Sequence, residues 1–335
     1  MRSATRKFLT VLRIAVGIGL LLYVLSVTGG WQTISRLGSS PWILVAVPIV
    51  NVLGTAIEAI RLRLLCGARG IDLTFARGFQ MVSIGTLYSF VLPGGTGGDV
   101  VKLYYIAREH RRRIMEAGLV LLVDRAVALF SLLLMILALA LLNLDIVLEH
   151  VIVLWLVIAA AVAASTVVCA MKVSFSARIR RSGPYLFVTR RLPLGRIIER
   201  VFDALYSFRE HKREILGAVG WSLCGHVCLG SILLMTGMAL MPDAPARILP
   251  FLSMLGLLAN IIPITPGGLG VGEAATETLY SLVGFSGGAA LILAWRLGTL
   301  PVCVIGSIYS IVGIKHRNLA TLTDEKEGKT TPPAK

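Results

Sequence analysis

The sequence predicts an all-α membrane protein with six full transmembrane helices and two re-entrant helical hairpins in an inverted-topology repeat. Of the 335 residues, 56% are hydrophobic and 15% are charged, and the mean hydropathy is +0.81. The charged residues gather in polar segments between long apolar runs. Two apolar regions are interrupted by nearly identical motifs, which run from Pro93 to Asp99 and from Pro266 to Glu273.

Six apolar runs are long enough to cross a bilayer, since about 20 helical residues span ~30 Å of hydrocarbon. They cover residues 8–28, 42–65, 117–142, 151–171, 215–241 and 289–314. Arg2, Arg6 and Lys7 precede the first run and Arg13 lies near its start, as in a signal peptide, but no A-x-A-like cleavage site follows Leu25. We therefore expect an uncleaved first helix, one transmembrane domain over 1–315, and a disordered polar tail over 316–335.

The net charge of +15 lies mainly in loops, where it sets the orientation of the helices. Cytoplasmic loops of membrane proteins carry an excess of Lys and Arg. The basic loops at 61–77, 102–113 and 172–213, the tail and both termini are therefore predicted to be cytoplasmic. Only Arg36 and Arg247 fall in outside loops. This charge pattern indicates orientation in a membrane and no nucleic-acid partner.

The long loop at 172–213 carries eleven Lys or Arg residues against three acids. Apolar residues recur at helical spacing between Ile197 and Tyr206, which predicts an amphipathic helix. Two placements fit this pattern. The helix would lie on the membrane surface, or it would pack on neighbouring cytoplasmic loops.

The two motifs have to turn the chain, because each motif segment has both ends on one side of the membrane. Segment 79–101 starts and ends at the cytoplasmic face, and segment 248–283 at the outer face. Proline removes a backbone donor and glycine permits φ > 0, so each motif breaks a helix. We predict re-entrant hairpins in which Gly95 and Gly268 need φ > 0 or a close backbone approach. The alternative is a pair of ordinary helix-ending turns at the membrane surface.

The spacing of the segments supports an internal duplication. The motif proline follows the start of the preceding span by 51 residues in both halves, counted from Trp42 and from Ile215. The predicted repeats, 42–142 and 215–313, each comprise a span, a hairpin and a span, in opposite orientations. Broken helices at corresponding positions of inverted repeats are typical of a transporter's binding site.

Charged residues inside membrane segments are costly, which makes them functional candidates by default. The candidates are Asp99, Lys102, Asp124, Arg125, Glu273, Glu277 and Arg296. Asp124 and Arg125 point about 100° apart on one helix, so they face different partners. Arg296 or Glu273 of the other repeat is the expected partner of one of these two residues. Alternatively, these charges pair only to fix the packing of the helices.

The glycines of both motifs offer an anion site, because a glycine-rich turn that opens a helix leaves N–H groups free at a positive dipole end. The candidate contacts are Gly94, Gly95, Gly97, Gly98, Gly267, Gly268, Gly270 and Gly272. Together with the cations Lys102, Arg125 and Arg296, they predict a phosphate-bearing guest. Alternatively, Asp99 and Glu273 cap the same N–H groups.

The sequence contains no Walker motif, no G-x-S-x-G, no H-E-x-x-H and no zinc spacing. The five histidines are scattered, and only His226 lies within a span. The five cysteines lie in or beside apolar segments, where they are interpreted as packing residues. Glu58 and Arg61 lie near a predicted membrane edge, where their side chains can snorkel. We expect no enzyme activity, no cofactor and no metal.

The motifs and intramembrane charges resemble the transmembrane region of lysylphosphatidylglycerol synthase/flippase proteins over about residues 8–315. The matching residues are Leu92–Asp99, Lys102, Tyr104, Asp124, Arg125 and Pro263–Glu273, with Arg61 and Arg296. The resemblance implies a stand-alone, flippase-like module of the bacterial cytoplasmic membrane. Bifunctional members add a soluble aminoacyl-transferase domain. That activity is not expected here, since the chain ends about 20 residues after its last span.

We expect a lipid translocator whose substrate is an anionic or phosphate-bearing membrane lipid. Its headgroup would meet the hairpin tips while its tails stay in the bilayer. A second possibility is a membrane enzyme or subunit of a lipid-linked glycosyl, hopanoid or glycolipid pathway, although no nucleophile or metal-binding acid pair is evident. A third is a channel or small-solute carrier, since re-entrant hairpins also build selectivity filters.

Cysteine labelling tests the predicted topology. Single cysteines at Ser182 and Ser286, in a background without the five native cysteines, are expected to react with an impermeant thiol reagent from opposite sides. The reason is that Ser182 lies in the basic loop and Ser286 in a predicted outside loop. Labelling of both from the same side would contradict the inverted repeat.

Overall fold

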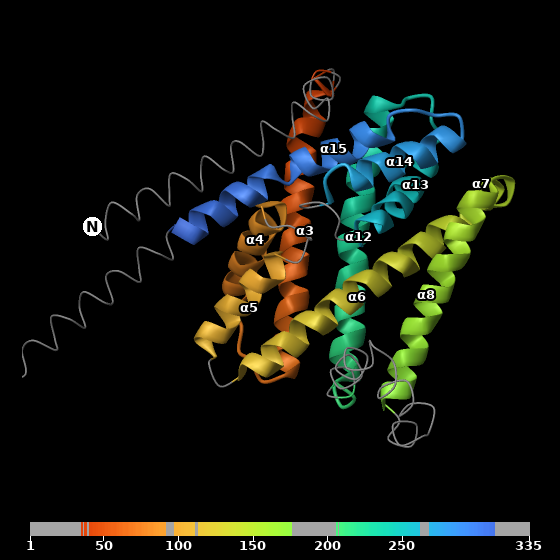
Figure 1. The fold of residues 1–335 in the computed structure, drawn as a ribbon. Helices are drawn as coiled ribbons and strands as arrows, with labels where there is room; N and C mark the ends of the chain where they lie inside the picture. The colour runs from red at the N-terminus through yellow and green to blue at the C-terminus, as the bar shows by residue number, and fades with distance from the viewer. Residues whose placement is uncertain are drawn as a thin grey trace, which may run out of the picture.

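The structure is a computed structural model that describes residues 35, 37–38, 40–91, 97–110, 113–175, 206, 208–261 and 268–311. Within these residues the secondary structure is helical, and no residue lies in a strand. The helices are α3 (Pro41–Ala68), α4 (Phe75–Val91), α5 (Gly97–Glu109), α6 (Ile114–Leu141), α7 (Leu144–Glu149), α8 (Val151–Phe175), α12 (Lys212–Leu240), α13 (Ile248–Leu257), η2 (Leu258–Ile261), α14 (Val271–Leu282) and α15 (Gly288–Gly298) (Figure 1).

Five helical segments of the described chain are long and apolar enough to cross a membrane. They are Pro41–Ala68, Ile114–Leu141, Val151–Lys172, Lys212–Leu240 and Gly288–Ile311. These segments correspond to the second to sixth predicted spans, and the first predicted span, 8–28, lies outside the described residues. The prediction of a helical, multi-pass membrane protein is confirmed.

The last span differs from the prediction, because it is not one continuous helix. α15 ends at Gly298, Thr299 forms a turn, and a second helical segment continues to Ile311. Pro301 explains the break, since proline has no N–H and cannot bond to the carbonyl four residues earlier. The turn is closed by a hydrogen bond from the Thr299 N–H to the Arg296 carbonyl at 3.0 Å.

α3 and α12 pack side by side at the centre of the helices and run in opposite directions (Figure 1). Their contacts show this direction, because residues further along α3 meet residues earlier in α12. A Cβ placed at Gly217 would lie 3.0 Å from Leu64, and one placed at Gly225 would lie 3.6 Å from Ile57. α3 opens the first predicted repeat and α12 opens the second, so the two halves meet along this pair.

Each half also contributes a pair of packed shorter helices, α4 with α5 and α13 with α14. The two pairs lie toward opposite ends of the central helices (Figure 1). The connections at 92–96 and 262–267, which hold the motif prolines, lie outside the described residues. The predicted order of span, helix pair and span is therefore present in both halves.

Two large hydrophobic clusters form the core. One joins α3, α4 and α5 to the first parts of α6 and α12, and the other joins the later parts of α6 and α12 to α7, α8, α13, α14 and α15. α6 therefore crosses from one cluster to the other, as its diagonal path in Figure 1 shows. Because α6 and α12 belong to both clusters, they tie the two halves together.

Loops that the charge pattern places on one side of the membrane meet at the same end of the molecule. Arg113 donates to the carbonyl of Arg69 at 2.7 Å, and the Arg69 guanidinium lies 5.6 Å from the centre of the Phe208 ring. Elsewhere, Arg247 forms an ion pair with Asp145. The basic loops thus gather together, and the predicted outside loop that carries Arg247 meets α7.

Gly98 allows α5 to lie directly against α4. A Cβ at this position would lie 2.5 Å from the Gly85 carbonyl oxygen and would also collide with the Ser89 hydroxyl. Gly98→Ala is expected to lower the free energy of unfolding by about 1–3 kcal/mol through overpacking. Gly118→Ala on α6 is the matched control, because its Cβ meets nothing within 4 Å. Thermal unfolding of the purified protein would reveal the difference, and equal effects of the two changes would contradict this packing.

Candidate functional site

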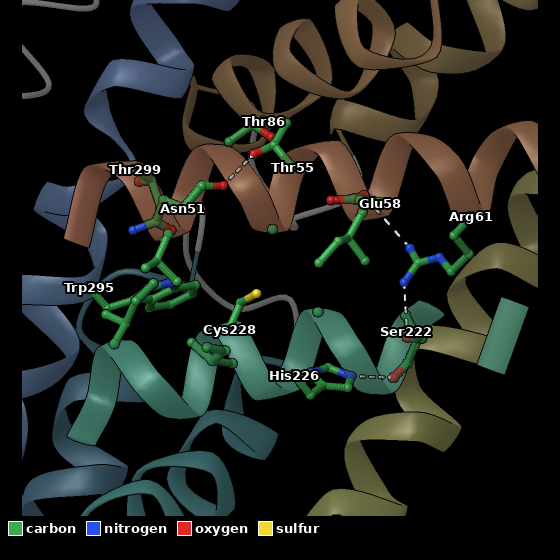
Figure 2. A pocket seen from close by; sticks show the side chains of 17 residues that line it. Asn51, Thr55, Glu58, Arg61, Thr86, Ser222, His226, Cys228, Trp295 and Thr299 are labelled. Atoms are coloured by element: carbon green, nitrogen blue, oxygen red, sulfur yellow. Dashed lines mark hydrogen bonds and ion pairs between the residues drawn. The ribbon is translucent and has the colours of Figure 1, made fainter. Parts of the chain in front are cut away.

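A cavity of about 370 Å³, lined by both polar and apolar side chains, lies between α3 and α12, where the two halves meet (Figure 2). This volume is within the usual range of small-molecule sites, about 300–1,000 Å³. The first half lines it from α3, α4 and α6, and the second half from α12, α15 and Thr299. Its polar lining comprises Asn51, Thr55, Glu58, Arg61, Thr86, Ser222, His226, Trp295 and Thr299.

The sequence of α3 explains why its polar residues share this wall. Asn51, Thr55 and Glu58 follow one another at i, i+4 and i+7, a spacing that places them on one helix face. Gly225 of α12 lies opposite them. It has no side chain to fill the cavity, and a Cβ added there would make only an ordinary contact of 3.6 Å with Ile57. Small residues on facing helices thus keep the space between them open.

Arg61 is the most enclosed charge at the cavity, and it is held by three hydrogen bonds. Its Nε and Nη2 donate to the two carboxylate oxygens of Asp124 at 2.7 and 3.1 Å, a bidentate arrangement. Its Nη1 donates to the Ser222 hydroxyl of α12 at 3.0 Å. Arg61 and Asp124 are 8% and 3% exposed, so this pair is shielded from solvent. Arg61 therefore links α3 to α6 and to the second half.

The Arg61–Asp124 pair belongs to a larger group that we call the first charge cluster, made of Glu58, Arg61, Asp99, Lys102, Asp124 and Arg125. The Lys102 ammonium lies 2.9 Å from Glu58 and 3.8 Å from Asp99. Arg125 forms an ion pair with Asp99. Three cations and three carboxylates from α3, α5 and α6 thus balance one another, which lowers the cost of burying them.

A second charge cluster lies in the other half, where Arg296 of α15 meets Glu273 of α14 at 2.7 Å. The other Glu273 oxygen accepts a hydrogen bond from the Gly270 N–H at 2.9 Å, and Arg296 donates to the Gly268 carbonyl at 2.9 Å. Both charged side chains are buried. The capping role considered for Glu273 is therefore confirmed, and the pair fixes the second glycine motif.

The prediction for Gly268 is also confirmed. Its φ is +68°, and a Cβ would lie 2.5 Å from the Asn260 side-chain oxygen. The corresponding prediction for Gly95 lies outside the described residues. Gly268 thus combines a left-handed backbone with a close approach to η2.

Two predictions about the charged residues are wrong, one about their pairing and one about the position of Arg61. Arg296 and Glu273 pair with each other, and Asp124 and Arg125 find Arg61 and Asp99 in their own half. Arg61 does not snorkel at a membrane edge, because its side chain is buried against α6 and α12, where it bonds to Asp124 and Ser222. Its spacing of three residues from Glu58, inside an apolar run, is the signal that could have identified it.

The other predicted site residues fall into three groups. Gly94, Gly95 and Gly267 lie outside the described residues, and Gly97 and Gly98 are buried at the start of α5. Gly268, Gly270 and Gly272 adjoin the second charge cluster. Of the candidates that the structure describes, none is among the residues that line the cavity, so their contact with a headgroup stays a prediction.

The cavity lining itself was not predicted, although His226 was noted as the histidine within a span. Its Nε2 lies 3.1 Å from the Ala128 carbonyl oxygen of α6.

Glu277, another predicted candidate, accepts hydrogen bonds from the N–H groups of Gly287 and Ala289 and so caps α15. Among the described residues, no group of three or more His, Cys, Asp or Glu is placed to hold a metal ion.

The different burial of the two arginines in the first charge cluster can be tested by substitution. Arg61→Gln strands the buried Asp124 carboxylate and is expected to cost about 3–5 kcal/mol of stability. Arg125→Gln is the control, because its side chain is 47% exposed and an exposed pair contributes about 0–1 kcal/mol.

Thermal unfolding and expression level would measure both effects. Adding Asp124→Asn to Arg61→Gln is expected to recover most of the lost stability, since no unpaired carboxylate then remains. Failure of this rescue would show that Arg61 stabilises the fold in some way other than by neutralising Asp124.

Comparison with known families places residues 10–306 in the family described as the lysylphosphatidylglycerol synthase TM region. The matched range includes both charge clusters and every residue that lines the cavity. No curated protein and no solved structure gives a significant match. The family is one of integral membrane proteins with a lipid-related role, in agreement with the helices described above. The chain therefore belongs to the lysylphosphatidylglycerol synthase TM region family.

Proposed function

We propose that this protein moves a phosphate-headed lipid between the leaflets of the bacterial cytoplasmic membrane. The observation that carries the proposal is the cavity between α3 and α12, which is lined by both halves and holds polar side chains beside apolar ones. Polar groups inside a membrane are costly unless they are paired or line a pathway. A headgroup would occupy the cavity while the acyl chains remain in the surrounding bilayer.

The arrangement of the halves supports alternating access. Substrate sites of secondary transporters lie between inverted repeats, near the middle of the bilayer. The opposite directions of α3 and α12, and the placement of the helix pairs toward opposite ends, are what an inverted repeat requires. We infer that α4–α5 and α13–α14 are re-entrant hairpins entering from the cytoplasmic and outer faces, with both termini cytoplasmic.

Some of the charged residues stabilise the packing of the helices, and others are placed to contact a ligand. Asp124 and the second charge cluster hold helices together, whereas Arg61 and Glu58 border the cavity. An arginine can bind a phosphate oxygen while it keeps its carboxylate partner, because its guanidinium has five N–H donors. The hydrogen bond from Arg61 to Ser222 joins the two halves and would respond when they move.

A plugging substitution tests whether lipid passes through the cavity. Gly225 faces the cavity and has room for a Cβ, so Gly225→Met is expected to fold and to extend its side chain into the space. Gly220→Met is the control, because it lies on the same helix at an exposed position with nothing within 4 Å. In liposomes with fluorescent lipids of different headgroups, Gly225→Met should slow movement at least about tenfold.

The competing functions give different results in the same vesicles. A membrane enzyme would yield a chemically altered lipid, detectable by mass spectrometry, without movement between leaflets. A channel or solute carrier would release a trapped ion or solute while lipids stay in place. Lipid movement that is equally fast in Gly225→Met and wild type would exclude this cavity as the pathway.

A further inference from the structure

Each half of the protein contains an ion pair built from equivalent positions. The glycine motif of the first half ends in Asp99, which lies in the first turn of α5 and pairs with Arg125 of α6. The glycine motif of the second half ends in Glu273, which lies in the first turn of α14 and pairs with Arg296 of α15. In both halves, therefore, the acid at the end of the motif binds an arginine of the following span.

The two pairs differ in how far they are exposed. The side chains of Arg125 and Asp99 are 47% and 21% exposed, whereas those of Arg296 and Glu273 are 4% and 7% exposed. A half-exposed charge within a membrane helix has to face water, because contact with hydrocarbon is costly. The first pair is therefore open and the second pair is closed, although both are built in the same way.

The closed pair also fixes the backbone of the second glycine motif. Arg296 donates to the Gly268 carbonyl at 2.9 Å, and Glu273 accepts from the Gly270 N–H at 2.9 Å. Both glycines have left-handed backbones, with φ of +68° and +82°. Separation of Arg296 from Glu273 would therefore release this part of the motif from α15.

The helix α15 connects the closed pair to the cavity. Trp295 lines the cavity, and Arg296 is the next residue along the helix. Thr299 lines the cavity as well, and its hydroxyl donates to the Arg296 carbonyl at 2.6 Å. Because Pro301 interrupts the hydrogen bonds of this span, α15 can tilt relative to the segment that follows. A ligand that displaces the Trp295 side of the cavity would thus move Arg296 as well.

We propose that the Asp99–Arg125 pair and the Glu273–Arg296 pair are alternating gates, so that one pair closes as the other opens. In inverted-repeat transporters, access alternates as one repeat moves against the other around a fixed site. The present structure is then the state in which the first half is open and the second half is closed. This inference rests on the proposed function, and it names the residues that seal each side of the cavity.

Two single cysteines can report the state of the gates in a background without the five native cysteines. Leu122 lies three residues before Arg125 and is 38% exposed, whereas Thr276 lies three residues after Glu273 and is fully buried. Residues three apart share a helix face, so each cysteine lies beside one pair. In the purified protein, a water-soluble thiol reagent should label Leu122→Cys readily and Thr276→Cys slowly.

The test combines these cysteines with Glu273→Gln and Arg296→Gln, which together remove both charges and leave no unpaired buried charge. The gates predict a reciprocal result, because a shift toward the other state opens the second pair and closes the first. Labelling of Thr276→Cys should become at least about tenfold faster, and labelling of Leu122→Cys at least about threefold slower.

Asp99→Asn with Arg125→Gln is the matched control, because it neutralises the equivalent pair that is already open. It should leave Leu122→Cys reactive and should not accelerate the labelling of Thr276→Cys. Arg296→Lys is a milder second variant for the case that the double change does not fold. It keeps the charge but loses the rigid fork that reaches both Glu273 and Gly268, so each labelling rate should shift in the same direction by about threefold.

The labelling rates decide the proposal independently of transport. Faster labelling of Thr276→Cys without slower labelling of Leu122→Cys would show that the pair only fixes local packing, and this would overturn the gates. Resistance of Leu122→Cys to the reagent in the protein with both pairs intact would overturn them too. Reciprocal labelling without lipid movement between leaflets would support the gates and contradict the proposed function. Lipid movement without reciprocal labelling would do the reverse.

Discussion

Charge neutralisation inside the helices is the constraint on which the rest of this structure depends. The bidentate pair of Arg61 and Asp124 fixes α3 against α6, and Arg61 also bonds to Ser222 of α12. A buried ion pair does not by itself stabilise a fold strongly, but loss of one partner is expensive. The pair therefore acts chiefly by excluding other arrangements of the helices. The cavity lies beside the helices that this pair positions, so the polar wall depends on it.

The fold was largely predictable, because its strongest signals are local in sequence. Length and apolarity identify membrane helices directly, and five described segments match their predicted counterparts. The positive-inside pattern predicts that the loops with Arg69 and Arg113 lie on the same side of the membrane, and in the structure these two residues are in contact. The break at Thr299 was missed, because a hydropathy window averages over a single proline such as Pro301.

The site was less predictable, because its contacts join residues far apart in the chain. The motif glycines and the intramembrane charges were predicted as site residues. In the structure, Gly268 has a positive φ, and Glu273 accepts a hydrogen bond from the Gly270 N–H. Pairing was mispredicted, since helical spacing gives a direction for Asp124 but not the identity of its partner. The cavity wall contains Asn, Ser and Thr residues. Single residues of these types do not stand out in the hydropathy of a long apolar run. Their common orientation is a property of how α3 meets α12.

The balance within each charge cluster has an electrical consequence. A protein element that carries equal numbers of positive and negative charges gains no net energy when it moves through a transmembrane voltage. One unbalanced elementary charge that crosses the full field exchanges about 2.3 kcal/mol per 100 mV. The first cluster holds three cations and three carboxylates, and the second holds one of each. Under the proposed function, the membrane field would therefore act on the charged lipid and not on these residues. An inside-negative potential would then drive an anionic headgroup toward the outer leaflet.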